Sequence, residues 1–192
     1  MIRALYDWTL RLAEHPHAMW ALAIIAFAES SVFPIPPDVL MIPMIVARPS
    51  KAFVIATVAL VASVLGGIFG YFIGAVLYEQ VGEPVLIALG KADYFAEFQQ
   101  LYTEWGIWVV LTAGVTPFPY KVITILSGAT ALPLGVFIAT SIVARGLRFF
   151  LVAGLLWKFG DPIREFVEKR LGLMFTLFIV LLLGGFLVVG YL

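Results

Sequence analysis

The sequence predicts an all-α polytopic membrane protein built on an inverted repeat, and three observations support this fold class. First, 62% of the 192 residues are hydrophobic, 12% are charged and the mean hydropathy is +1.05, whereas about a quarter of the residues of a soluble domain are charged. Second, two proline-rich breaks interrupt apolar runs. Third, the two halves of the chain resemble each other around these breaks.

The chain is expected to begin with an amphipathic helix on the membrane surface, over residues 1–17. Arg3, Asp7, Arg11 and Glu14 come before any apolar run, as in a helix that lies in the membrane interface. The short apolar core and the small-residue cleavage site of a secretory signal peptide do not follow this basic start.

The first repeat, about residues 18–78, is expected to combine a broken apolar segment with an unbroken one. Residues 19–32 and 39–47 are apolar apart from Glu29, and each stretch is too short to cross the hydrocarbon alone. Together they form either one kinked span or a hairpin that enters and leaves the membrane on the same face. Residues 52–78 contain no charge and are predicted to be a complete span.

The second repeat, about residues 107–160, follows an acidic amphipathic connection over residues 79–106. Residues 107–132 are again two short apolar pieces, and residues 133–157 form the second predicted span. Residues 161–192 are expected to add a polar connection and a C-terminal transmembrane helix. The membrane domain proper is therefore predicted to cover both repeats, from residue 18 to residue 160.

Both broken segments are interrupted by prolines, which break a helix because they have no backbone N–H. The first break contains Pro34, Pro36 and Pro37, and the second contains Pro117 and Pro119. Irregular backbone at membrane depth occurs only where it is buried in protein or lines a wet cavity. Interrupted segments in corresponding positions of two halves point to a transport site.

An offset of 83 residues relates the two breaks, because Pro34-x-Pro36 then corresponds to Pro117-x-Pro119. If each broken segment is a re-entrant hairpin, each repeat holds one hairpin and one crossing, and the second repeat is inverted. Eight basic residues then lie on the inner side, and Lys91 alone lies outside, as the positive-inside rule requires. The inner residues are Arg3, Arg11, Arg48, Lys51, Lys158, Arg164, Lys169 and Arg170. We therefore predict a cytoplasmic N-terminus, hairpins from opposite faces and an outer C-terminus.

Five ionisable residues lie within the predicted membrane segments and are the candidates for a functional site. Glu29 and Asp38 flank the first break and Lys121 follows the second. Arg145 and Arg148 are three residues apart, on one face of the second span. Each such residue costs about 2.5–3.5 kcal/mol at a helix centre on translocon scales, so we expect the acids to face the bases in a common interior. A static set of ion pairs that fixes the hairpins is the alternative.

The three basic residues are typical of an anion site. Arginine forms bidentate hydrogen bonds with phosphate, and half-helices that begin after the prolines would aim backbone N–H donors at the same point. We therefore predict that Lys121, Arg145 and Arg148 bind substrate. An apolar setting favours the protonated form of a carboxylate, so Glu29 and Asp38 would balance the charges and would permit proton coupling.

A ridge of small residues runs along the first span, where Ala62, Gly66, Gly70 and Gly74 recur every four residues. Such a ridge lets another helix approach closely. We expect the ridge to seat a hairpin or the second span. A seam between copies of a homo-oligomer is the less favoured alternative.

Several other classes of function are disfavoured. The chain has no cysteine and no net charge, which argues against thiolate metal sites and nucleic-acid partners. His15 and His17 have no array of carboxylates nearby, so we predict neither a metal site nor a cofactor. Gly-x-Ser-x-Gly, His-Glu-x-x-His and Walker motifs are absent, so we expect no enzyme, although an aspartate-based hydrolase stays open. A channel would need a polar lining, which the apolar residues 52–78 do not offer.

The motifs at the breaks resemble those of the DedA membrane-protein family, also called the VTT or SNARE-associated domain family, and most of all its YqaA branch. They are residues 28–40 (AESSVFPIPPDVL) and 116–128 (TPFPYKVITILSG), together with residues 66–74 and 145–149. The resemblance extends over about residues 18–160. It implies two opposed re-entrant hairpins, a place in the bacterial inner membrane and a lipid-handling role.

Bacterial members of this family are implicated in returning undecaprenyl phosphate or phospholipid across the inner membrane, and eukaryotic relatives in lipid scrambling. The family's acids around the first hairpin correspond to Glu29 and Asp38. Many relatives carry an arginine just before the second proline motif, where this chain has Gly114 or a neighbour, so Lys121 is the base of its second hairpin. The resemblance implies a transporter or scramblase for phosphate-bearing lipids. The alternative is a scaffold or membrane-homeostasis protein without transport.

Overall fold

The computed structural model describes residues 17–33, 35–90, 92–116 and 119–160. Within these ranges the regular elements are all helical and no strand occurs. The predicted N-terminal surface helix and C-terminal span lie outside the described residues, as do Pro34 and Pro117.

The described elements follow one another with short connections. They are α2 (Ala18–Ser31), α3 (Asp38–Ala47), the 3₁₀ turn η1 (Pro49–Lys51), α4 (Ala52–Leu77), the π-helical turn η2 (Tyr78–Gly82), α5 (Glu83–Ala88), α6 (Ala92–Val115), α7 (Tyr120–Ala129) and the Leu134–Gly160 helix. Two helical stretches, Pro49–Ala88 and Leu134–Gly160, are long and apolar enough to cross a membrane. They correspond closely to the two spans that the sequence predicts in this part of the chain, residues 52–78 and 133–157.

Each proline-rich break separates two helices, as predicted. α2 ends at Ser31 before α3 begins at Asp38, and α6 ends at Val115 before α7 begins at Tyr120. Pro37 and Pro119 stand immediately before α3 and α7. The missing N–H of a proline costs little at such a position, because the first N–H groups of a helix have no partner within it.

Helix α6 is longer than the sequence suggested, because it begins at Ala92 inside the acidic connection and not near residue 107. Its buried residues, among them Tyr102, Gly106 and Val110, recur every four positions and form one continuous face. The acidic residues of this helix, such as Glu104, are exposed. The amphipathic face of α6 therefore continues from the acidic connection into the apolar segment that follows it.

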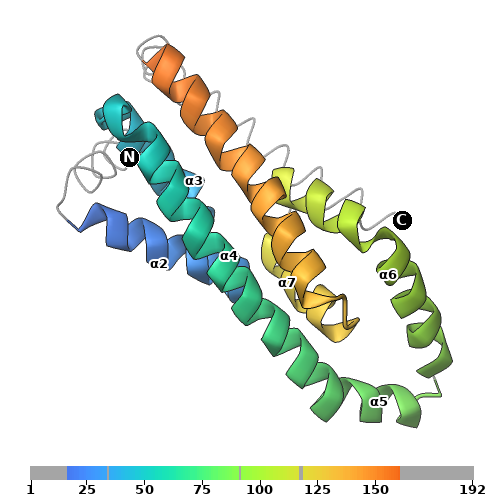
Figure 1. Ribbon diagram of the computed structural model, residues 1–192. Coiled ribbons are helices and arrows are strands. Elements are labelled where there is room, and N and C mark those ends of the chain that lie inside the picture. Colours follow the sequence, from blue (N-terminus) through green and yellow to red (C-terminus); the bar gives the residue numbers. More distant parts are fainter. Residues whose placement is uncertain (1–16, 34, 91, 117–118, 161–192) are drawn as a thin grey trace, which may run out of the picture.

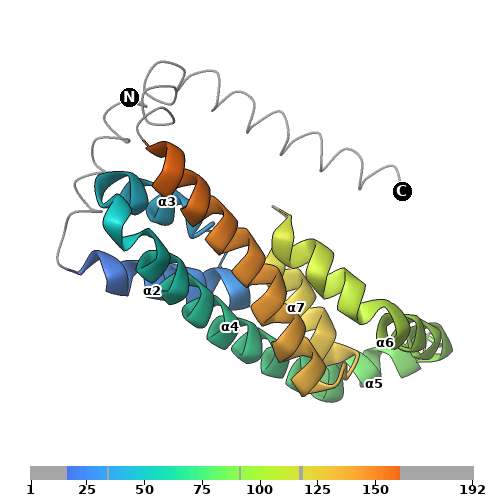
Figure 2. The same cartoon turned by 45° about the horizontal axis from the view of Figure 1, so that its top comes forward.

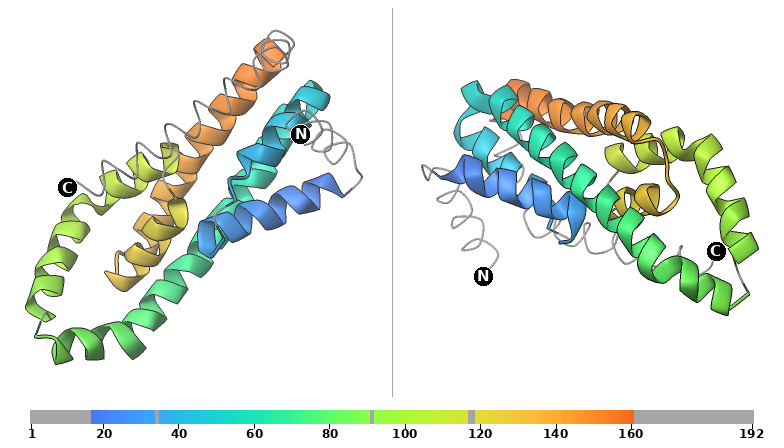
Figure 3. Two further views of the ribbon diagram at one scale, coloured as in Figure 1. Left: turned by 180° about the vertical axis from the view of Figure 1, so that it is seen from behind. Right: turned by 60° about the horizontal axis from the view of Figure 1, so that its bottom comes forward.

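The helices form two broken pairs beside two long helices. Figures 1 and 2 show α2 crossing α4, with α3 returning toward the N-terminal end of α4. The second pair, α6 and α7, reaches the middle of the molecule from the other end, as the views from behind and below also show (Figure 3). Both α2 and α7 pack against α4. The two breaks therefore approach each other near the centre of the bundle.

The small-residue ridge of α4 lies against both broken pairs. A Cβ atom on Gly66 would overlap the backbone of Phe27 in α2, and one on Gly74 would overlap the backbone of Ile125 in α7. At Gly70 an added Cβ would lie 3.0 Å from the carbonyl oxygen of Ser30 in α2, and it would overlap a side chain of α7. Glycine is needed here because the backbones of three helices come into contact.

Two hydrophobic clusters make up the described core. The first joins α2, α3 and the beginning of α4 to the second half of the Leu134–Gly160 helix, and it includes Phe149. The second joins α6 and α7 to the beginning of that helix, and it includes Tyr120. Arg145 lies between the two clusters, with its guanidinium 4.6 Å from the ring centroid of Phe149 and 4.9 Å from that of Tyr120.

Candidate functional site

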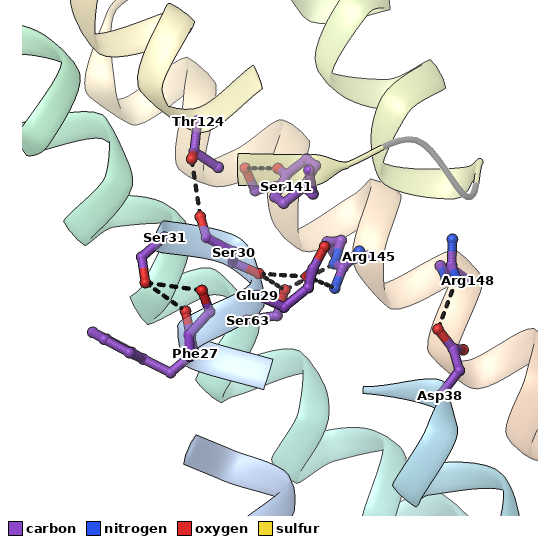
Figure 4. Close-up of polar contacts among 12 residues, drawn as sticks. Phe27, Glu29, Ser30, Ser31, Asp38, Ser63, Thr124, Ser141, Arg145 and Arg148 are labelled. Atoms are coloured by element: carbon purple, nitrogen blue, oxygen red, sulfur yellow. Dashed lines mark hydrogen bonds and ion pairs between the residues drawn. The ribbon is translucent and has the colours of Figure 1, made fainter. Parts of the chain in front are cut away.

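A buried ion pair joins α2 to the Leu134–Gly160 helix at the centre of the bundle (Figure 4). Nη2 of Arg145 lies 2.8 Å from Oε2 of Glu29, and the two side chains are 2% and 11% exposed. The guanidinium also lies over two aromatic rings, which adds a cation–π attraction to the ion pair. We call Glu29 and Arg145 the inner pair.

Two serines complete a ring of hydrogen bonds around the inner pair. Nε of Arg145 donates to Oγ of Ser63 at 2.8 Å, and Oγ of Ser30 donates to Oε2 of Glu29 at 3.1 Å. The two hydroxyl oxygens lie 2.7 Å apart. Because the Ser30 hydroxyl donates its hydrogen to Glu29, the Ser63 hydroxyl must be the donor in the hydrogen bond between the two serines. Every hydrogen bond of the ring therefore has a fixed direction, from the guanidinium through both hydroxyls to the carboxylate.

A second ion pair lies nearer the surface, between the two breaks. Nη2 of Arg148 lies 2.7 Å from Oδ2 of Asp38, and the side chains are 18% and 17% exposed. Nη1 of Arg148 donates to the carbonyl oxygen of Thr116 at 2.6 Å. Because Asp38 follows the first break and Thr116 opens the second, Arg148 holds the two breaks together. We call Asp38 and Arg148 the outer pair.

Lys121 is placed differently from the two arginines. Its ammonium donates to the carbonyl oxygen of Val32, at the end of α2, over 3.3 Å. A cation is favourable there because the last carbonyls of a helix lack partners and carry partial negative charge. No carboxylate of the described residues lies within ion-pair distance of Lys121. Thr124 adds a second link, since its hydroxyl donates to the carbonyl oxygen of Ser30 at 2.9 Å.

The candidate residues of the sequence thus fall into two ion pairs and one lysine. Both acids come from the first half of the chain and all three bases come from the second. Glu29 and Asp38 each lie beside one arginine, which is where charge-balancing residues would lie. Among the described residues, no three His, Asp or Glu side chains are grouped so that they could hold a metal ion.

Sequence reasoning missed Ser30 and Ser63, which close the ring of the inner pair. The available signals were weak, because single serines are common in apolar helices. Ser30 adjoins Glu29, and Ser63 stands four residues before Gly67 in a span without charge. The hydrogen bond between these serines spans 33 residues of sequence, so it depends on the packing of α2 on α4.

Comparison with known proteins identifies the family of the chain. A family model described as the VTT domain matches residues 35–158, which is more than half of the chain. The chain belongs to the VTT domain (DedA) family. Membership of this family and the two long apolar helices make it a membrane protein.

Two relatives of this VTT domain protein cover most of its length. One is an uncharacterized protein from Haemophilus influenzae, 38% identical over 168 residues, and the other is an uncharacterized protein from Histophilus somni, 36% identical over 168 residues. Each alignment covers 85% of this chain and 87% of the relative. No solved structure matches the chain.

Proposed function

We propose that this VTT domain protein moves lipids with a phosphate head group, such as phospholipids or undecaprenyl phosphate, across the bacterial inner membrane. The observation that supports this proposal best is the position of Arg148. Its side chain is partly exposed, and its guanidinium lies at the junction of the two breaks and is paired with one carboxylate oxygen. Arginine at such a point suits a phosphate because its planar fork can form two hydrogen bonds with it.

In this proposal α4 and the Leu134–Gly160 helix cross the membrane, while α2–α3 and α6–α7 are re-entrant hairpins of two inverted repeats. The opposite approach of the two broken pairs supports this topology (Figure 1). So does the charge distribution, because Arg48, Lys51 and Lys158 stand at the ends of the long helices that lie together in Figure 1. These ends would face the cytoplasm by the positive-inside rule, together with the N-terminus.

The proposed mechanism uses the two ion pairs differently. A phosphate head group enters between the breaks and is held by Arg148 and Lys121, while the acyl chains stay in the bilayer. Arg145 is buried and already bonded to Glu29, so it contributes to the binding of the anion only once the inner pair opens. Protonation of Glu29 or Asp38 would remove the charge that holds its arginine, and this is where transport would couple to protons.

The test is lipid translocation by the pure protein in proteoliposomes, measured with a fluorescent phospholipid whose outer-leaflet signal is quenched. We expect a rate above that of empty liposomes, and we expect Arg148→Ala to abolish the difference. Thr57→Ala is the matched control, because the Thr57 hydroxyl is exposed and bonds within its own helix to the carbonyl oxygen of Phe53. Arg148→Ala with the wild-type rate would refute the site.

A scaffold or membrane-homeostasis protein without transport is the second candidate. The inner pair favours this candidate, because its ring of hydrogen bonds is closed and buried. An ion pair whose role is only to fix two helices together would have the same features. Absence of translocation by the folded wild-type protein, in liposomes that contain acidic phospholipids, would favour this candidate over transport.

A further inference from the structure

The two arginines of the site use the same edge of their guanidinium groups to different extents. On this edge the Nε–H and one N–H of Nη2 point the same way, so that one anion can accept both. On Arg145 both donors are used, because Nε binds Ser63 and Nη2 binds Glu29. On Arg148 only Nη2 is used, by a single oxygen of Asp38.

The other donor of that edge, Nε of Arg148, is buried and has no hydrogen-bond partner among the described residues. A buried donor without a partner costs free energy, and native structures contain few of them. The Asp38 carboxylate approaches the edge from one end only, with its Oδ2 atom 2.7 Å from Nη2. The outer pair therefore leaves half of a bidentate anion site vacant.

The guanidinium would stay in place if Asp38 moved away. Nη1 of Arg148, on the opposite side, donates to the carbonyl oxygen of Thr116 at 2.6 Å. The outer pair is also the more open of the two, at 18% and 17% exposed against 2% and 11% for the inner pair. Arg148 is thus the more accessible of the two arginines.

We propose that the Asp38 carboxylate occupies the place of a phosphate group on the Nε–Nη2 edge of Arg148, and that a phosphate ligand binds by displacing it. A tetrahedral phosphate has an oxygen for each donor of the edge, whereas Asp38 fills one. Asp38 is then a built-in competitor, which keeps Arg148 paired until a ligand arrives. This inference rests on the proposed function, since it assigns the phosphate of the transported lipid to this edge.

The test is the affinity of the full chain in detergent for dihexanoyl phosphatidic acid, measured by native mass spectrometry and calorimetric titration. The Asp38→Asn substitution removes the competing carboxylate and is expected to lower the Kd about tenfold. A change of this size corresponds to the contribution of roughly one charge-assisted hydrogen bond. Asp93→Asn removes the same charge at an exposed site in α6 and is expected to leave binding within about twofold. Asp38→Ser is the second variant if Asp38→Asn does not yield folded protein.

Arg148→Lys, made in the Asp38→Asn background, tests the edge itself. Lysine keeps the charge but has no planar fork, so we expect it to remove the tenfold gain. Equal tightening by Asp38→Asn and Asp93→Asn, or full retention of the gain by Arg148→Lys, would overturn the inference.

Two further ligands identify the source of the phosphate. Binding of phosphatidic acid but not of inorganic phosphate or dihexanoylglycerol supports a lipid head group, whereas equal binding of inorganic phosphate overturns that source.

The two proposals fail separately. If the wild-type protein translocates lipid but Asp38→Asn binds phosphatidic acid no more tightly, the competitor inference is wrong and the transport proposal stands. If Asp38→Asn binds about tenfold more tightly but the wild-type protein does not translocate lipid, the anion site stands and the transport proposal is wrong.

Discussion

Substitution of Gly74 by alanine is expected to force α7 away from α4. The added Cβ would overlap the carbonyl group of Ile125 and would lie 2.7 Å from its carbon atom, where ordinary contact begins near 3.4 Å. The obstructing atoms are backbone and cannot rotate aside, and the carbonyl oxygen lies even nearer than the carbon, so the two helices must move apart. Overpacking of this kind costs up to about 3 kcal/mol. Alanine regains about 1 kcal/mol of helix propensity, so we expect a net loss of about 2 kcal/mol.

Gly154→Ala is the matched control, because a Cβ at this helical position would meet no atom of the described residues within 4 Å. Only the propensity term remains there, and it stabilises by up to about 1 kcal/mol. Thermal unfolding in detergent, followed by circular dichroism, should shift in opposite directions for the two variants, by about 2–4 °C for each kcal/mol. Shifts of the same sign and size would refute the claim that the backbones of α4 and α7 are in contact.

Three further substitutions can be measured in the same thermal assay. Ala131 has a φ of +55°, which costs an L-residue about 1–2 kcal/mol, so Ala131→Gly should stabilise by about 1 kcal/mol. Glu29→Gln leaves Arg145 buried without its counter-charge and should cost about 3–5 kcal/mol; a smaller loss in the Glu29→Gln/Arg145→Met double variant checks this reason. Ser63→Ala deprives Nε of Arg145 of its acceptor and should cost about 1–3 kcal/mol, against less than about 0.5 kcal/mol for the exposed Thr57→Ala.

Much of the fold could be predicted because the bilayer restricts the choices. Prolines cannot donate to a helix, so the ends of α2 at Ser31 and of α6 at Val115 follow from the sequence. Charges in apolar segments need partners, so Glu29 and Asp38 were expected to face basic residues. The spacing of Arg145 and Arg148 places them on one face, but it does not tell which acid each of them contacts. That choice depends on the angle at which α2 and α3 meet the Leu134–Gly160 helix.

Other features depend on packing that no local pattern encodes. The ring through Ser63 requires α2 to lie directly on the small-residue ridge of α4, and a serine in an apolar helix more often bonds to its own backbone. Lys121 looked like a partner of the arginines because it follows the second break. In the structure its ammonium reaches Val32 at the end of α2, where the attraction comes from unpaired carbonyls and leaves no periodic signal in the sequence.

The predicted repeats are alike in their prolines but not in their charges, and this difference bears on the mechanism. At the offset of 83 residues, Arg145 and Arg148 correspond to Ala62 and Leu65, so the site exists once and both ion pairs run from one repeat to the other. Alternating access by motion of one repeat against the other would therefore have to break both pairs. In the outer pair, a phosphate can replace the Asp38 carboxylate on Arg148. In the inner pair, Glu29 and Arg145 are buried, so no ligand from outside can replace the Glu29 carboxylate. In the proposed transport cycle, the separation of Glu29 from Arg145 is therefore the more demanding step, because this pair is the more deeply buried of the two.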